Sequence, residues 1–345
     1  MSTDETSQAA SPMPAPPSDA EMEELRQLAS IFLPHSYKRS LQAYPEKQSA
    51  KFAHYTSADA AMQIIETKRF WMRNAMCMAD YSEVNHGFEL LKKALSVETG
   101  FKALEAALDQ CASGVARQAV EIFDHHLIAI RTNTYIACVS EHDSKEDLHG
   151  RLSMWRAFGS AGGTRVALVL SVPWYSSASW VLNVTFSPVA YLSDSEVAAE
   201  VASVIENVRA NAKFLREVDP AKVLATMFTM LLTATTCLKH EGFAEEKEWR
   251  AIYEPTWAPP HSRGLMECST RCVNGVPQHV YEIPVDVRRS PAFADVDLAQ
   301  MFERLIIGPT QYPWPIREAF VDALTKAGVQ EAGARVFISG IPIRT

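Results

Sequence analysis

Two adjacent side chains near the start of the chain have the residue types of a binding site. His54 and Tyr55 lie in Phe52–Tyr55, a predicted first strand that leads directly into a predicted helix. Successive side chains of a strand face opposite sides, so one of the pair can enter a cleft while the other packs. The alternative is that both are ordinary core residues at the end of a strand.

A group of charged residues late in the chain could supply a reacting carboxylate. Glu246, Glu248 and Arg250 occupy alternate positions, so a strand here would place all three on one face. Two acids and a base on one strand face cost stability unless that face is solvated or forms a site. The segment therefore predicts a site built on these residues, with a solvated edge strand as the alternative.

Aromatic and acidic residues between these two segments could complete such a site. Phe70 and Trp71 precede Asp80, which forms a predicted capping box with Glu83 at the start of a helix. The alternatives are that Trp71 is a core residue and that Asp80 serves only as the N-cap.

A glycine-rich segment invites comparison with a phosphate-binding loop. Gly159–Gly163 follows a predicted helix and precedes a predicted strand. A phosphate loop has the reverse order, because it uses the N–H groups at the start of the following helix. The glycines therefore predict a structural turn at the end of a helix.

Metal and hydrolase motifs are weak in this chain. Histidines adjacent to acids occur in three groups, which are Asp124–His126, Glu141–Asp143 and His240–Glu241. Adjacent residues on a helix point in different directions, so such a pair seldom chelates one ion. Of the six cysteines, only Cys268 and Cys272 are close together in the sequence. We expect no metal, and the chain contains no G-x-S-x-G elbow of a serine hydrolase.

Charge and hydropathy exclude several classes of protein. The 345 residues carry a formal charge of −8, and residues 1–30 hold six acids against one base. A globally basic nucleic-acid-binding protein is therefore excluded, and nucleic acid could bind only through the local basic region 38–73. The longest apolar run, Val223–Leu238, is too short for a membrane span and predicts a buried helix. With no secretory signal at its start and scattered cysteines, the chain is expected to be cytoplasmic.

Helical and strand periodicity occur in blocks along the chain. The first predicted helix follows a capping box of Thr56 and Asp59 and ends near Lys68, and the second runs from Asp80 to Leu95. Further helices are predicted over 101–131, 196–218, 221–239 and 316–327. Predicted strands are Phe52–Tyr55, Thr134–Ser140, Arg165–Ser171, Leu182–Tyr191, Glu248–Tyr253, Val280–Val285, Arg304–Ile307 and Arg335–Ile338.

This block order predicts an α+β fold with a mainly antiparallel, split sheet and flanking helices. We expect a disordered, acidic and proline-rich tail over residues 1–20. Residues 21–345 are then one α+β domain with helical insertions near 98–131 and 195–240, which could form a lid or a partner surface.

The order of these motifs resembles a mostly bacterial domain-of-unknown-function family, numbered twenty-nine seventy-one. The resemblance covers roughly residues 50–310. It is carried by His54-Tyr55-Thr56, Phe70-Trp71, Asp80 with Glu83, Val139-Ser140-Glu141, Met154-Trp155, Gly163 with Val166–Leu170, Glu246-x-Glu248-Trp249-Arg250 and Leu305–Gly308. The chain departs from the family pattern at Ala79 and Tyr81, where an Asn and a Pro are expected, so any role of that Asn is lost here.

A looser resemblance to ADP-ribosyltransferases implies roles for these residues. Such enzymes use an early-strand His or Arg, aromatic residues that stack on nicotinamide, and a late-strand Glu that stabilises the oxocarbenium charge. The resemblance implies that Glu248 is catalytic with Glu246, and that NAD is a co-substrate. The cofactor-binding residues would be His54 for the adenosine ribose, Tyr55 or Trp71 for the ring, Arg73 or Arg250 for the pyrophosphate, and Trp155.

Three functions remain open from the sequence. The first is an ADP-ribosyltransferase-like, NAD-consuming enzyme that modifies an unknown macromolecular acceptor or hydrolyses NAD. The second is a non-catalytic ligand- or partner-binding protein of a bacterial defence or toxin system. The third is a metal-dependent hydrolase that uses Asp80, Glu83 and Glu248.

Overall fold

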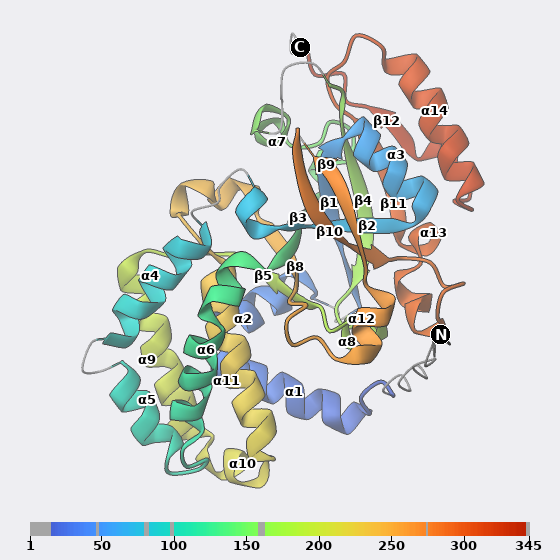
Figure 1. Cartoon of the computed structure of the whole chain (residues 1–345). Coiled ribbons are helices and arrows are strands. Elements are labelled where there is room, and N and C mark those ends of the chain that lie inside the picture. Colours follow the sequence, from blue (N-terminus) through green and yellow to red (C-terminus); the bar gives the residue numbers. More distant parts are fainter. Residues whose placement is uncertain are drawn as a thin grey trace, which may run out of the picture.

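The computed structural model describes residues 15–45, 48–78, 83–96, 100–157, 163–273 and 275–342. Figure 1 shows a twisted sheet between two groups of helices, a large one at the lower left and a small one at the upper right. The predicted α+β class is confirmed.

One large, mostly antiparallel sheet forms the centre of the molecule. Its strands are β1 (Ser49–Ser57), β2 (Arg69–Asn74), β3 (Tyr135–Glu141), β4 (Arg165–Pro173), β5 (Thr185–Pro188), β8 (Glu248–Tyr253), β9 (Glu267–Val273), β10 (Val276–Pro284), β11 (Phe302–Ile307) and β12 (Val336–Ile338). Their spatial order is β12-β11-β4-β1-β3-β2-β10-β9, and β8 pairs with both β3 and β5. Among the strands that the structure describes in this sheet, β11 and β12 are the one parallel pair. A separate parallel pair joins β6 (Ala190–Tyr191) to β7 (Leu238–Lys239).

The sheet splits at β3. β1 pairs with the end of β3 at Ser140 and Glu141, whereas β2 pairs with its start at Tyr135 and Ile136. β8 pairs with β3 along nearly its whole length. Strand β8 is thus an interior strand, and the alternative that it is a solvated edge strand is wrong.

The helices flank this sheet and also form a layer of their own. They are α1 (Asp19–Phe32), α2 (Pro34–Ala43), α3 (Ala58–Thr67), α4 (Glu83–Ser96), α5 (Phe101–Leu108), α6 (Val115–Thr132), α7 (Leu152–Ala157), α8 (Ser177–Leu182), α9 (Asp194–Ala210), α10 (Ala212–Glu217), α11 (Pro220–Thr236), α12 (Pro260–Leu265), α13 (Leu298–Met301) and α14 (Pro313–Lys326). Short 3-10 helices are η1 (Ala75–Cys77), η2 (Ser144–Glu146), η3 (Glu241–Glu246), η4 (Pro291–Val296) and η5 (Ala332–Ala334).

The two segments predicted as helical insertions pack against each other. Helices α5 and α6 from the first and α9 to α11 from the second share one apolar core with α1 and α4, which we call the helical layer. Its centre contains Phe32, Leu108, Phe123, Val208 and Met227, all buried. The helices approach closely, since a Cβ added to Gly87 of α4 would lie 2.5 Å from the carbonyl oxygen of Thr235 in α11.

The two faces of the sheet have different cores. On one face, α3 and α14 pack over Leu168, Phe302 and Leu305, and we call this the α3 face. On the other, α7 packs over Tyr55 and Val169, and we call this the α7 face. Which side chains can meet therefore depends on the face to which each belongs.

Several local predictions are corrected by the structure. Helix α3 is capped by Ser57, whose Oγ accepts the N–H of Ala60, whereas the predicted cap Thr56 is still part of β1. The predicted strand Leu182–Tyr191 is instead the end of α8 followed by β5 and β6. Strands β2 and β9 and helices α1, α2 and α8 have no predicted counterpart.

The predicted tail and two predicted motifs fall wholly or partly outside the described residues. These are residues 1–14 of the tail, Asp80 of the second capping box, and most of the glycine segment 159–163. Helix α1 begins at Asp19, inside the predicted tail, and Ser18 and Glu21 form its capping box. Among the described residues, no helix combines the length and apolar composition needed to cross a membrane.

Candidate functional site

Strand register places five of the predicted site residues on one side of the sheet. Ala53 pairs with Ser140, which pairs with Glu248, and Cys138 pairs with Arg250. Directly paired residues face the same side, and so do residues two apart in a strand. Arg73 pairs with Ile136, two residues before Cys138. Tyr55, Trp71, Arg73, Glu248 and Arg250 therefore all belong to the α7 face.

His54 lies on the opposite side of the sheet. It follows Ala53 in β1, and its ring makes an edge-to-face contact with Phe70 of the α3-face core, with centroids 5.7 Å apart. Its Nδ1 is 2.8 Å from the carbonyl oxygen of Cys138, and burial lowers the pKa of the imidazole. The prediction that His54 and Tyr55 face opposite ways is thus confirmed. The structure does not bring His54 and Glu248 together, as one NAD site would require.

Glu246 does not lie on the strand that carries Glu248. It ends the 3-10 helix η3, and Lys247 follows in the left-handed region with a φ of 46°. Strand β8 begins only at Glu248, so the predicted common strand face holds for Glu248 and Arg250 but is wrong for Glu246. The two carboxylates are nevertheless joined by Lys239, whose Nζ lies 2.8 Å from Glu246 and 3.3 Å from Glu248.

The Glu248 carboxylate is locked in buried ion pairs. Arg250 Nε donates to Oε1 at 2.8 Å and its terminal nitrogen to Oε2 at 3.2 Å, while Lys239 contacts Oε2. Burial alone would raise the pKa of this carboxyl, but the charge and hydrogen bonds of Arg250, aided by Lys239, hold it at about 2. An ionised carboxylate with both oxygens engaged cannot exchange protons near neutral pH. In this arrangement Glu248 orders β8 and the end of α11.

Tyr55 and Trp155 are packing residues of the α7 face. Their rings meet edge to face with centroids 4.9 Å apart, and both side chains are buried. The Tyr55 hydroxyl accepts the N–H of Arg151, and Trp155 Nε1 donates to the carbonyl of His149. A Cβ at Gly308 would lie 3.0 Å from the Trp155 ring, so the backbone closes over it. Neither ring offers a free face for stacking a ligand.

Trp71 and Arg73 are more accessible, since both are half-buried. The guanidinium of Arg271 lies 5.5 Å from the centre of the Trp71 ring. Arg73 is hydrogen-bonded to Gln278 Oε1 and the carbonyl of Cys77, and no carboxylate in the described part of the chain pairs with it. Burial lowers the pKa of Arg73, which is the expected consequence of a cation without a counter-ion.

Potential metal ligands within the described residues occur in pairs. No group of three or more His, Cys, Asp and Glu side chains within the described ranges could hold an ion. His142 Nε2 lies 2.9 Å from Asp147 Oδ1, and Cys268 Sγ lies 3.8 Å from His279 Nδ1 on the exposed β9–β10 hairpin. Of the three carboxylates considered for a hydrolase, Asp80 lies outside the described residues.

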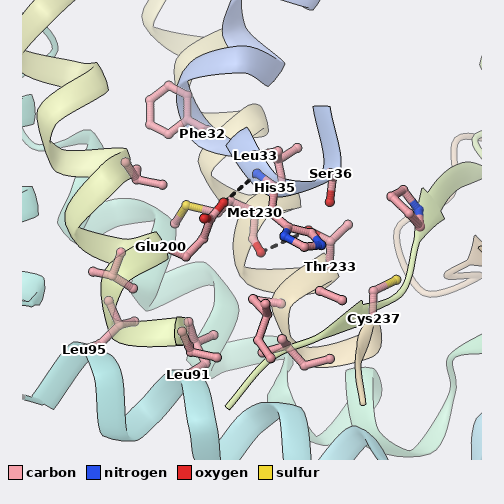
Figure 2. Close-up of a pocket in the computed structure, with 18 of the residues that line it drawn as sticks. Phe32, Leu33, His35, Ser36, Leu91, Leu95, Glu200, Met230, Thr233 and Cys237 are labelled. Carbon is pink, nitrogen blue, oxygen red and sulfur yellow. Dashed lines mark hydrogen bonds between the residues drawn. The ribbon is translucent and has the colours of Figure 1, made fainter. Parts of the chain in front are cut away.

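The helical layer contains a cavity that the sequence did not reveal. Its volume is about 90 Å³, and it lies where α2, α4, α9 and α11 meet β6 and β7. Figure 2 shows Leu91 and Leu95 at its lower end and Glu200, His35 and Ser36 in its upper half. We call it the helical cavity. The sequence signal nearest to it is the apolar run Val223–Leu238, which supplies one wall of the cavity but by itself predicts only a buried helix.

Comparison with known proteins covers the middle of the chain. Residues 154–251, from within α7 to the middle of β8, match the model of a family described as "Protein of unknown function (DUF2971)". This is the family numbered twenty-nine seventy-one above. Neither the curated proteins nor the solved structures contain a match. Over this segment, which includes Trp155, Glu248 and Arg250, the chain resembles the DUF2971 family.

Proposed function

We propose that this protein binds a small apolar molecule in the helical cavity. The observation that supports the proposal is the cavity itself, which is walled mainly by Phe32, Leu91, Leu95, Val201, Met230 and Leu238. Apolar cavities of comparable size, on the order of 100 Å³, stay dry and take up small apolar molecules. Spaces between the helices of a bundle, lined by apolar groups with a few polar ones, are common ligand sites.

The ion pairs of Glu248 with Arg250 and Lys239 favour a binding protein over an enzyme. Glu248, the expected catalytic group, is held by Arg250 and Lys239, and His54 points to the other face of the sheet. The helical cavity, in contrast, is already open in this structure. The proposed function is thus the non-catalytic, ligand-binding alternative of the sequence analysis, with the ligand site in the helical cavity.

Filling the cavity should abolish binding. Ala234 lines it from α11, and Ala225 is exposed on the same helix. Benzene and hexan-1-ol should shift the ¹³C-methyl resonance of Met230, another lining residue, in the wild type. The Ala234→Phe substitution should weaken binding at least tenfold, whereas Ala225→Phe should bind like the wild type. Absence of any shift at Met230 with both probes would overturn the proposal.

A second candidate is the NAD-consuming, ADP-ribosyltransferase-like reaction. It is favoured by the register that places Trp71, Arg73 and Glu248 on one face of the sheet. Arg73 has no carboxylate partner among the residues that the structure describes, and such an arginine suits a pyrophosphate. The half-buried Trp71 on the same strand face could stack a ring. For this reaction Glu248 would have to exchange its contact with Arg250 for one with the ribose.

Nicotinamide release separates the two candidates. If NAD is consumed, Glu248→Gln should lower the release at least a hundredfold. Glu318→Gln is the matched control, because Glu318 is an exposed glutamate of α14 and has no assigned part in the reaction. Both variants must first give the circular dichroism spectrum of the wild type. Absence of nicotinamide release by wild-type protein, with and without candidate acceptors, would end this candidate.

A further inference from the structure

Strand β9 forms one edge of the large sheet. It pairs with β10 on one side, and the strand order places no described strand on its other side. In an antiparallel pair, alternate residues direct their backbone N–H and C=O groups away from the partner strand. No hydrogen bond joins these outward groups of β9 to another residue in the described part of the chain. Five of its seven residues are exposed, so the edge is open to a further strand.

Strand β9 has few of the features that keep edge strands from pairing. Proteins protect such edges with prolines, lysines, bulges or very short strands. The seven residues of β9 include no proline and no lysine, and all seven pair with β10 in one continuous register. The two charged side chains are already engaged on the face of the sheet, Glu267 by Arg69 and Arg289, and Arg271 by Glu282. Their charges therefore do not block the edge.

The sequence of β9 is complementary to its own reverse. Thr270 is the central residue, so a two-fold axis at Thr270 would pair all seven residues with β9 of a second copy. Thr270 then opposes itself, Cys268 opposes Cys272, Ser269 opposes Arg271, and Glu267 opposes Val273. Opposed threonines are favourable, whereas opposed like charges are unfavourable and do not occur in this register. Glu267 is instead diagonal to Arg271 of the second copy, which has the opposite charge.

The same register brings exposed cysteines of the two copies together. Cys268 and Cys272 lie four residues apart in one extended strand, a separation of roughly 13 Å that no disulfide can span. Opposed residues of antiparallel strands have Cα atoms about 4.5–5.5 Å apart, which lies within the range for a disulfide. A bond between these two cysteines therefore reports on pairing between copies.

We propose that β9 pairs antiparallel with β9 of a second copy, with the two-fold axis at Thr270, so that one continuous sheet crosses the dimer. A two-fold dimer uses the same surface on both copies, as this strand does. Main-chain hydrogen bonds of the added strand supply the affinity. One strand pair is a small interface, so the dimer is expected to be weak and to depend on concentration. The interface is separate from the helical cavity, and the inference does not rest on the proposed function.

Charges introduced at the two-fold axis test the contact by analytical ultracentrifugation. Wild-type protein should show a monomer–dimer equilibrium. Thr270→Lys and Thr270→Glu should each weaken dimerisation at least tenfold, because each opposes like charges, and an equimolar mixture of the two should restore it. Thr325→Lys, at an exposed threonine of α14, should dimerise like the wild type. A wild-type monomer at every concentration, or dimerisation unchanged by both Thr270 variants, would overturn the proposal.

Cross-linking tests the register. Diamide takes up the two thiol hydrogens as it is reduced to a hydrazine, so it should join Cys268 of one copy to Cys272 of the other by a disulfide. Cys268→Ser and Cys272→Ser should each lose this dimer, whereas their mixture should regain it, because each mixed dimer keeps one opposed pair. Mass spectrometry of the linked peptides identifies the bond. A bond between two Cys268 or two Cys272 residues, or no bond at this strand, would contradict the axis at Thr270.

Discussion

Replacing Arg250 with methionine is expected to lower the free energy of unfolding by about 3–5 kcal/mol, the usual cost of removing one partner from a buried ion pair. The Arg250 side chain is among the largest fully buried ones, with 1% of the residue exposed. Its substitution would leave Lys239 as the cation that contacts the buried Glu248 carboxylate. Methionine keeps most of the side-chain length, so lost charge rather than lost volume dominates the effect.

The position of Arg250 explains why this loss should spread through the fold. Its guanidinium also donates to the carbonyl oxygen of Thr236, at the end of α11. One side chain thus links the central strand β8 to the longest apolar helix of the helical layer. Arg250→Lys should recover only part of the stability, because an ammonium group cannot form the two-pronged contact with Glu248.

Chemical denaturation followed by circular dichroism measures this effect. The matched control is Arg209→Met, since Arg209 pairs with Glu206 on the exposed side of α9 and both side chains are about half exposed or more. An exposed pair contributes about 0.2–1 kcal/mol, so this variant should stay within that range of the wild type. Equal losses in the two arginine variants would contradict the structural role of the Glu248–Arg250 pair.

The elements with strong apolar patterning could be predicted from the sequence. Strands β1, β4, β8 and β11 are found close to their predicted positions, because runs such as Arg165–Ser171 are rich in valine and leucine and are buried. Helices α9 and α11 also lie close to the predicted helical segments 196–218 and 221–239, and α11 contains most of the long apolar run Val223–Leu238. Strand β9 was missed because Glu267–Val273 is polar and mostly exposed, and its pairing with β10 rather than burial makes it a strand.

The relative placement of the site residues could not be predicted from local sequence. The face on which His54 lies relative to Glu248 depends on two strand pairings, β1 with β3 and β3 with β8. A shift of one residue in either pairing would move His54 to the same face of the sheet as Glu248. Local sequence patterns do not specify the register between strands that lie nearly 200 residues apart in the chain. Glu246 was misplaced for a local reason, because the left-handed turn at Lys247 precedes the strand.

Several residues that carry the family resemblance form contacts that hold the sheet together. Trp249 Nε1 donates to the Glu141 carboxylate at 2.9 Å, which ties β8 to β3. The Arg151 guanidinium, next to Met154-Trp155, contacts the carbonyls of Glu141, Glu245 and Glu246. A motif order that resembles a family can thus describe a scaffold, and the ligand site need not lie among those residues. The helical cavity lies in the helical layer, outside this set of contacts.

Substitution of Glu254 by glutamine is expected to stabilise the protein at neutral pH. Glu254 is 3% exposed, its Oε1 contacts the Thr134 hydroxyl, and its Oε2 has no partner in the described part of the chain. Thr134 Oγ1 also lies within hydrogen-bond distance of the Ile130 carbonyl, to which its single proton can be donated. Both contacts form together only if Glu254 is protonated and donates to Oγ1.

The pKa of Glu254 gives the sign of the effect. Burial raises the pKa from its ordinary value of 4.5 to about 9, against a small opposing influence of Thr134. Below pH 4.5 both the folded and the unfolded state carry the proton, so the group does not affect stability. Above it the unfolded state ionises first, and the free energy of unfolding falls by up to about 1.4 kcal/mol per pH unit until the folded pKa is reached. At pH 7 the accumulated loss is on the order of 3 kcal/mol.

Glutamine keeps the shape of the protonated acid and can donate its amide N–H to Thr134, but it has no proton to lose in the unfolded state. The gain of Glu254→Gln over the wild type should therefore be small at pH 4.5 and grow steadily to about 1–3 kcal/mol at pH 7. Glu318→Gln, an exposed glutamate in α14, should give a curve of stability against pH parallel to that of the wild type. Denaturation curves recorded between pH 4.5 and 8 give the free energy of unfolding of the wild type and of both variants. A constant difference in the free energy of unfolding between Glu254→Gln and the wild type over this range would mean that Glu254 is ionised in the folded protein. In that case the Thr134 hydroxyl donates to the Glu254 carboxylate.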